Sequence, residues 1–370
     1  MARLRPGLNE QPNPDQMNTQ IFPGQPWLDT EGKRIQAHGG SILFEDGVYH
    51  WYGENKEKTD GAKPADGSPR IWHWGVRSYR STDLVNWEDE GLIIPPRPDE
   101  PGHPLHPASM MDRPHIVRNA RTGKYVAWLK IMQPDGTQTE TVLAADRFHG
   151  PYEVVRTGLR PLGMSAGDFD LAIAPDGKAY YYFERVHSEL ICADLTDDYT
   201  DVTGYYSTHF PRPYPPYVRE APAHFVRNGK HYLITSGTTG YCPNPSELAV
   251  ADTWHGPYRV LGNPHPGDPT RTSFHSQVSS VFKVPGKKDL YVALGDRWLP
   301  RDTDRPYEVT HAFFDSCFGE RNEDAVRAWN ALPPPGGNTS IADYVWLPFR
   351  FDGEMGYLDW RDAWSPADYE

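Results

Sequence analysis

The amino-acid sequence predicts an all-β protein and, more narrowly, a five-bladed β-propeller with a central pocket. The first observation is composition: aromatic residues make up 13% of the chain, and they accompany 37 Pro and 33 Gly. This mixture is typical of many short strands joined by turns. The second observation is an internal repeat, in which an apolar strand, a turn built on Gly and an aromatic-rich strand recur along the chain.

The repeat occurs five times, with starts roughly 50 to 75 residues apart, the span of a four-stranded blade with its loops. The copies begin at His38 before GGSILFEDGVYHWYG, Asp112 before RPHIVRNARTGKYVAWL, Asp170 before LAIAPDGKAYYYF, Glu220 before APAHFVRNGKHYLITS, and Gln277 before VSSVFKVPGKKDLYVAL. Segments such as VLAADRFHGPYEVV and LAVADTWHGPYRVL supply the outer strands. Four strands per repeat therefore follow.

One long stretch near the C-terminus, residues 302–343, interrupts the repeat. The spacing of apolar residues in EDAVRAWNAL predicts a short amphipathic helix that ends at PPPGG. We expect this insertion near the mouth of the pocket. The predicted domain organisation is an N-terminal extension over residues 1–19 and one catalytic propeller over residues 20–370.

Charge and cysteine content exclude several classes of partner. The chain has 37 basic and 50 acidic residues, net charge −13, and no basic stripe, which argues against nucleic-acid and membrane partners. Its three Cys match no metal-ligand spacing, and we predict reduced thiols. The start MARLRPGLNEQ lacks an apolar stretch, so we expect a cytoplasmic protein, or a secreted one if a leader has been removed. The oligomeric state is not fixed by the sequence.

The inner strands of a propeller converge on one axis, so the residues that begin the five copies should surround a common pocket. Three of these residues are the carboxylates Asp112, Asp170 and Glu220. Carboxylates close together raise one another's pKa, which is typical of a catalytic site. The alternative interpretation is that they cap backbone amides at strand ends.

At these positions the sequence resembles glycoside hydrolase family 43, and within it the exo-β-1,3-galactanases. The resemblance runs from about residue 20 to residue 364 and is carried by IQAHGGSILFEDGVYHWYGENK, DRPHIVRNARTGKYVAWL, REAPAHFVRNGKHYLITSGTTGYCPNP, FHSQVSSVF, GDRWLP and YVWLPFRFDGE. It implies an inverting, exo-acting hydrolase that releases terminal galactose from β-1,3-galactan-type or related galactose-containing oligosaccharides.

The resemblance also implies residue roles. Glu220 matches the general acid, and Asp170 matches the carboxylate that raises the pKa of that acid. Gln277 matches a glutamine proposed to act as base through its imidic acid tautomer. Asp112 stands where the galactanases typically have Glu, so either Gln277 is the base or it orients a water whose proton goes to Asp112.

A sugar pocket needs aromatic faces and polar groups at the hydroxyl edges. The candidate substrate-binding residues are Glu54, His38, Arg113, Tyr241, Asn244, Arg297 and Trp298. Trp298 could instead pack between blades, and Arg297 could pair with Asp296. No metal-ligand pattern is predicted, and no cofactor is required, although the resemblance implies a central calcium ion near His275.

Three other functions remain open. An exo-furanosidase, acting on α-L-arabinofuranose or β-galactofuranose, is the nearest alternative, because the shorter Asp112 could change which sugar fits. A glycoside phosphorylase would need a basic cluster for phosphate. A non-catalytic glycan-binding propeller would not need the paired acids Glu220 and Asp170.

Overall fold

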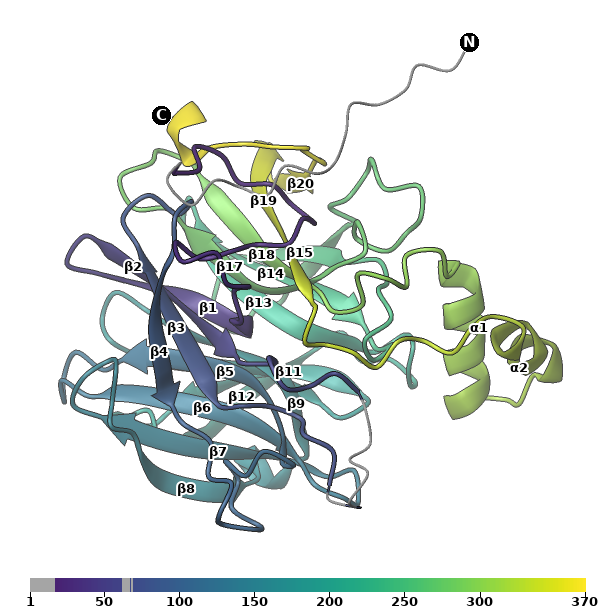
Figure 1. Ribbon diagram of the computed structural model, residues 1–370, viewed down its shortest axis with the longest axis horizontal. Coiled ribbons are helices and arrows are strands. Elements are labelled where there is room, and N and C mark those ends of the chain that lie inside the picture. Colours follow the sequence, from purple (N-terminus) through teal and green to yellow (C-terminus); the bar gives the residue numbers. More distant parts are fainter. Residues whose placement is uncertain (1–16, 62–66, 68) are drawn as a thin grey trace.

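The computed structural model describes residues 17–61, 67 and 69–370 of the chain. These residues form five four-stranded antiparallel sheets, so the prediction of a five-bladed propeller is confirmed (Figure 1). Within each sheet the strands pair in chain order, from the innermost strand to the outermost. The predicted N-terminal extension, residues 1–19, lies almost wholly outside the described residues.

The innermost strands of the five blades are β1 (His38–Glu45), β5 (Met110–Arg118), β9 (Ala166–Ile173), β13 (Arg219–Arg227) and β17 (Gln277–Lys283). The second strands are β2 (Val48–Glu54), β6 (Tyr125–Met132), β10 (Ala179–Arg185), β14 (Lys230–Gly237) and β18 (Tyr291–Arg297). The third strands are β3 (Val76–Ser81), β7 (Gln138–Ala145), β11 (Glu189–Leu195), β15 (Glu247–Ala251) and β19 (Asp343–Asp352). The outermost strands are β4 (Glu88–Ile94), β8 (Glu153–Leu159), β12 (Val202–His209), β16 (Arg259–Gly262) and β20 (Met355–Leu358).

Each pair of neighbouring blades encloses its own hydrophobic core, which explains why most strands are apolar on both faces. The core between the first and last blades is the most aromatic. It contains the fully buried Trp51, Trp87 and Trp346. Such large rings bury enough apolar area to hold the blades face to face.

The ring closes where β1 lies against β17. The last blade is built entirely from C-terminal strands, and the N-terminal segment only bridges to it. Ile21 pairs with Trp364 in an isolated β-bridge, and the Gly24 amide donates to the Tyr344 carbonyl over 2.6 Å. The two ends of the described chain therefore meet on the last blade.

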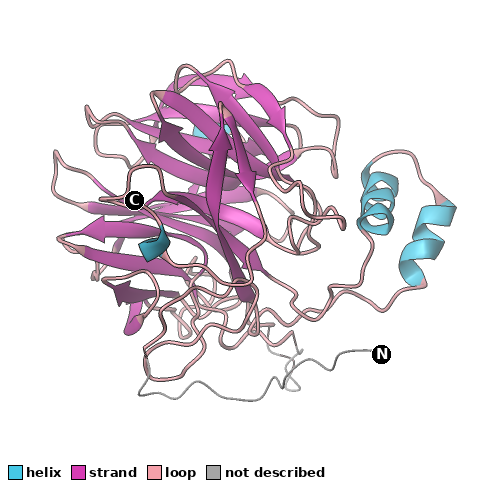
Figure 2. Ribbon diagram, turned by 90° about the horizontal axis from the view of Figure 1, so that it is seen from above, coloured by secondary structure: helices cyan, strands magenta, loops and turns pink. Residues whose placement is uncertain are grey.

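The insertion forms two helices, where the sequence predicted one. These are α1 (Tyr307–Phe318) and α2 (Glu323–Asn330), which stand to one side of the propeller (Figure 2). Phe313 and Trp329 stack between them with ring centroids 4.2 Å apart. The other helical turns are the 3-10 segments η1 (Pro161–Gly163) and η2 (Pro366–Asp368). Among the described residues, no helix has the length and apolar character needed to cross a membrane.

Candidate active site

The site is built at the starts of the inner strands, where three of the five have the same local backbone. The pairs His38-Gly39, Asp112-Arg113 and Glu220-Ala221 each place a polar residue before a residue with positive φ, at 62°, 53° and 48°. The strand register shifts at each of these points. Such bulges re-aim a side chain at the end of a strand, and they are frequent beside active sites. Left-handed Arg113 and Ala221 store backbone strain at this site.

The second strand of a blade adds a polar residue opposite each of these inner-strand starts. The register pairs are His38 with Glu54, Asp112 with Lys130, Glu220 with Ser236, and Gln277 with Asp296. In four of the five blades, the first and second strands thus place polar residues side by side at the start of the inner strand. Lys130 could have been found from the sequence by this pairing, because it lies near the end of β6, directly after the segment RPHIVRNARTGKYVAWL that follows Asp112.

Several of these residues line a central cavity of about 290 Å³, close to the lower limit for small-ligand pockets. Its lining residues are Glu54, Trp72, Asp112, Arg113, Lys130, Met132, Asp168, Glu220, Gly240, Tyr241, Gln277 and Trp298. Seven of the eleven site residues predicted from the sequence thus meet in one place: Glu220, Gln277, Asp112, Glu54, Arg113, Tyr241 and Trp298.

Glu220 carries the electrostatic signature of a proton donor. Its burial raises the pKa of the carboxyl well above the usual range, and the negative charges of Asp168 and Glu184 raise this pKa further. Lys130 and Arg113 oppose the shift without reversing it. The raised pKa favours the protonated form of Glu220, the form that a general acid needs.

Asp168 lines the same cavity as Glu220, but its surroundings shift its pKa in the opposite direction. Arg113 Nη2 lies 3.0 Å from its Oδ2, and Lys130 Nζ lies 2.7 Å from its Oδ1. Burial alone would raise the pKa of Asp168, but these two cations outweigh it and hold the pKa well below its usual range. The surroundings thus shift the pKa values of Asp168 and Glu220 in opposite directions, down for Asp168 and up for Glu220.

Asp170, which the resemblance implied as the carboxylate that raises the pKa of the acid, does not line the cavity. Its Oδ2 accepts the backbone N–H of His224 over 2.7 Å, and its Oδ1 accepts that of Leu171 over 2.8 Å. His115 Nδ1 lies 2.9 Å from the same Oδ1. Asp170 thus caps backbone amides, which is the alternative interpretation stated above.

The reason for this difference is position along the strand. Asp168 is the third residue of β9, as Asp112 is the third residue of β5, so both reach the cavity. Asp170 points to the same face of β9 but lies one pleat further from the strand start. Counting from the strand start would have distinguished the two acids in GDFDLAI.

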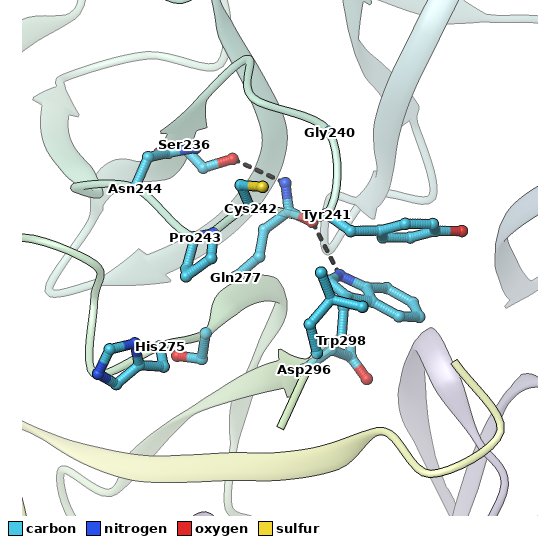
Figure 3. Close-up of a pocket in the computed structure, with 12 residues that line it drawn as sticks. Ser236, Gly240, Tyr241, Cys242, Pro243, Asn244, His275, Gln277, Asp296 and Trp298 are labelled. Carbon is cyan, nitrogen blue, oxygen red and sulfur yellow. Dashed lines mark hydrogen bonds between the residues drawn. The ribbon is translucent and has the colours of Figure 1, made fainter. Parts of the chain in front are cut away.

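Gln277 uses its whole side-chain amide in the network drawn in part in Figure 3. Its carbonyl oxygen accepts Arg113 Nη2 over 2.5 Å and Trp298 Nε1 over 3.2 Å. Its amide nitrogen donates to Ser236 Oγ over 2.9 Å and to Glu220 Oε1 over 3.2 Å. A guanidinium and an indole N–H can only donate, so they fix which end of the amide is the oxygen.

Asp112 lines the same cavity as Glu220 and lies two blades away from it. Trp72 Nε1 donates to its Oδ1 over 2.7 Å, and Lys130 Nζ lies 3.4 Å from its Oδ2. Lys56 pairs with Glu54 over 2.6 Å and is 3.7 Å from Asp112. Buried cations thus accompany each acidic wall of the cavity.

An aromatic wall faces the cavity. Tyr241 lies between two indoles, with its ring centroid 6.2 Å from Trp72 and 5.3 Å from Trp298. Such rings can bind the apolar face of a sugar. Trp72 was not predicted, because its IWHW segment lies outside the repeated strands and carries no signal of where it would pack.

Three predicted substrate-binding residues do not line this cavity, and the first is His38. Its side chain is 0% exposed. Nδ1 lies 3.1 Å from Asp296 Oδ1, Nε2 lies 3.2 Å from the Tyr344 hydroxyl, and its ring stacks on Tyr344. His38 therefore supports the inner wall from behind and has no polar atom left for a sugar.

Asn244 and Arg297 are also structural in this geometry. The Asn244 amide bonds both backbone groups of Gly237 and the Thr239 hydroxyl, which closes its loop. Arg297 donates to the carbonyls of Gly24 and Phe274 over 3.2 and 2.9 Å, so it anchors the N-terminal segment rather than pairing with Asp296.

The residues around His275 do not fit the calcium ion that the resemblance implied. Calcium takes six to eight oxygen ligands. Burial lowers the pKa of His275, and the Arg297 cation, which lowers it further, is close enough to repel a second cation there. The nearby Asp268 carboxylate is already used by the Thr270, Thr272 and Phe274 N–H groups. In the described part of the chain, no group of three ligating side chains includes His275.

A five-bladed propeller whose central cavity holds one carboxyl with a raised pKa and one with a lowered pKa, beside an aromatic wall, has the features expected of a glycoside hydrolase site. The family model for glycosyl hydrolases family 43 matches residues 65–309, and the chain belongs to this family. No curated protein matches the chain.

Solved structures agree with this assignment. A family 43 β-1,3-galactosidase is 27% identical with a TM-score of 0.75, and the match covers 95% of this chain and 64% of that one. A second, solved with galactodeoxynojirimycin, is 28% identical with a TM-score of 0.73 and coverages of 93% and 100%. An exo-β-1,3-galactanase from Clostridium thermocellum is 26% identical with a TM-score of 0.70 and coverages of 93% and 66%. The chain thus spans less than two thirds of the first of these proteins.

Proposed function

We propose that this chain is an inverting, exo-acting glycoside hydrolase that releases terminal galactose from β-1,3-galactan-type or related galactose-containing oligosaccharides. The observation that carries the proposal is that Glu220 and Asp168 line the same central cavity, where their surroundings raise the pKa of Glu220 and lower that of Asp168. The solved β-1,3-galactosidases and galactanase at 26–28% identity support the choice of sugar.

In this mechanism Glu220 protonates the glycosidic oxygen as the bond to the anomeric carbon breaks. Asp168 keeps the proton on Glu220 in the resting enzyme and stabilises the positive charge that develops on the sugar ring. Arg113 and Lys130 in turn keep Asp168 ionised. The aromatic wall of Trp72, Tyr241 and Trp298 binds the ring, and the small cavity suits removal of one terminal residue.

The group that activates water must lie on the other face of the sugar. In an inverting pair the two groups are about 6.5–9.5 Å apart, which leaves room for that water. Gln277 is in hydrogen-bond contact with Glu220, so it is too close for this role. Asp112 lies two blades from Glu220 around the same cavity.

The hydrogen bonds of Gln277 lead to the same assignment. An imidic acid carries its proton on oxygen, and that O–H would need an acceptor. Here the oxygen faces only the donors Arg113 and Trp298, which stabilise the ordinary amide. We therefore assign proton acceptance to Asp112 and the positioning of Glu220 to Gln277.

An exo-furanosidase is retained as the second candidate, because Asp112 is one methylene shorter than the Glu expected in galactanases. A shorter side chain moves its carboxylate and changes the ring that fits between it and Glu220. The protonation scheme would be the same for either sugar.

The test is product release from β-1,3- and β-1,6-galactobiose, arabino-oligosaccharides and nitrophenyl furanosides, with the anomer followed by proton NMR. We expect galactose from the β-1,3 substrate, appearing first as the α-anomer. Activity on furanosides alone would contradict the proposed substrate. Galactose that appears first as the β-anomer would contradict the inverting mechanism. Glu220→Gln serves as the inactive control.

A further inference from the structure

A cluster of two histidines and a glutamate lies outside the central cavity, between the first and second blades. His50 is on β2, Glu90 on β4, and His149 in the turn after β7. His50 Nδ1 is 3.0 Å from Glu90 Oε2, and His149 Nε2 is 2.9 Å from Glu90 Oε1. One ligand atom from each residue lies within 4.8 Å of the others, and none of the three residues lines the central cavity.

The surroundings hold two of the three side chains in place and leave the third accessible. His50 and Glu90 are 13% and 10% exposed, whereas His149 is 49% exposed. Ser78 Oγ donates to Glu90 Oε2 over 2.8 Å, and the Phe148 ring packs on both imidazoles. A hydroxyl that orients a carboxylate and an apolar shell are features that tune metal sites.

The chain contains an internal comparison for this cluster, because the FHGPY turn recurs as WHGPY two blades later. There His255 Nε2 lies 2.8 Å from Asp194 Oδ1 of the preceding blade, just as His149 reaches Glu90. The ring of Tyr180 packs edge-on against His255, as that of His50 packs against His149. Lys178 occupies the other Asp194 oxygen over 2.7 Å.

The two contacts therefore share a framework but differ in chemistry. At Asp194 a permanent cation completes the ion pair, and an ammonium group cannot bind a metal. At Glu90 a second imidazole takes its place, which creates a set of two nitrogens and one carboxylate. This donor set suits Zn²⁺ and its neighbours in the first transition row rather than calcium or magnesium.

We propose that His50, Glu90 and His149 bind a divalent transition-metal ion, Zn²⁺ by the nature of the donors, that clips the first blade to the second. Water completes the tetrahedron. Nitrogen ligands about 2.0 Å from zinc lie about 3.3 Å from one another, so the cluster must contract slightly. His149 can supply this movement because it is exposed in a turn.

The experiment uses tag-free full-length protein, freed of metal with a chelator and titrated with ZnCl₂ by calorimetry. Each variant is also melted with and without Zn²⁺, so that a direct effect of the substitution on folding cancels from the comparison. The variants are His149→Gln and His50→Gln. His255→Gln is the matched control, because it breaks the equivalent contact without touching the proposed ligands.

We expect the wild type to bind one Zn²⁺ per chain with a rise in Tm, and Co²⁺ to give the visible spectrum of a four-coordinate ion. Loss of either histidine should weaken binding at least about 100-fold, because even outer-shell changes cost 10–100-fold. His255→Gln should bind as the wild type does. Absence of binding in the wild type, unchanged binding in His149→Gln, or equal loss in His255→Gln would each overturn the proposal.

Discussion

The side chains of Gln277 and Glu220 are joined by a hydrogen bond of 3.2 Å from the amide nitrogen to Oε1. The same amide accepts Arg113 at its other end, and Arg113 pairs with Asp168. The acid and the carboxylate that raises its pKa are thus connected through Gln277 and Arg113. Gln277 has the geometry of a positioning residue.

Replacing Glu220 with Gln should abolish turnover. The amide keeps the shape and the contact with Gln277 but cannot donate a proton, so kcat should fall by at least about 10³-fold for a natural leaving group. Binding of oligosaccharide, measured by calorimetry, should change little. A variant with wild-type kcat would remove Glu220 from the mechanism.

Asp168→Asn should move the alkaline limb of the pH profile. Activity requires protonated Glu220 and is lost as pH rises through its raised pKa. Removing the Asp168 charge lowers that pKa, and the freed cations Arg113 and Lys130 lower it further. The alkaline limb of kcat/KM should therefore shift to lower pH by about one unit or more. Asp170→Asn is the comparison and should leave that limb in place.

Asp112 and Gln277 can be separated by chemical rescue. If Asp112 accepts the water's proton, Asp112→Asn should lower kcat about 10²- to 10⁴-fold, and azide, which needs no base, should restore turnover. Gln277→Ala should also slow the reaction severely, but azide should not rescue it because the lost function is positioning of Glu220. Rescue of Gln277→Ala and not of Asp112→Asn would identify Gln277 as the base.

His38→Ala should cost stability rather than substrate affinity. The change removes a buried ring and leaves Asp296 Oδ1 without its imidazole partner, whereas the Tyr344 hydroxyl keeps its hydrogen bonds to the backbone of Ala37 and Ile35. Each unsatisfied buried group costs about 1–3 kcal/mol of the free energy of unfolding. Urea denaturation measures this loss, while KM should stay within about twofold of the wild-type value at a temperature where the variant is folded. A large rise in KM with unchanged stability would show that His38 contacts the substrate.

Several features of this protein follow from the sequence alone. The repeat of strand, turn and aromatic strand specifies five blades, because each copy carries its own hairpin signal and its own apolar faces. Glu220, Asp112 and Gln277 could be placed in the pocket for the same reason, since each stands at the start of a copy. The local sequence pattern is sufficient to place a residue wherever the repeated blade structure determines its position.

Only the tertiary structure decided which polar residues face the cavity and which support it. Asp168 and Asp170 lie on the same face of β9, two residues apart. Asp168 lines the cavity, whereas Asp170 accepts hydrogen bonds from backbone amides. His38 lies at a strand start yet is used behind the wall, and Trp72 arrives from a loop. The same holds for His50, Glu90 and His149, which meet across two blades from distant parts of the chain. These outcomes depend on how far along the propeller axis a residue lies and on which residues of the neighbouring blade it contacts. The alternation of residues along a single strand contains no information about either.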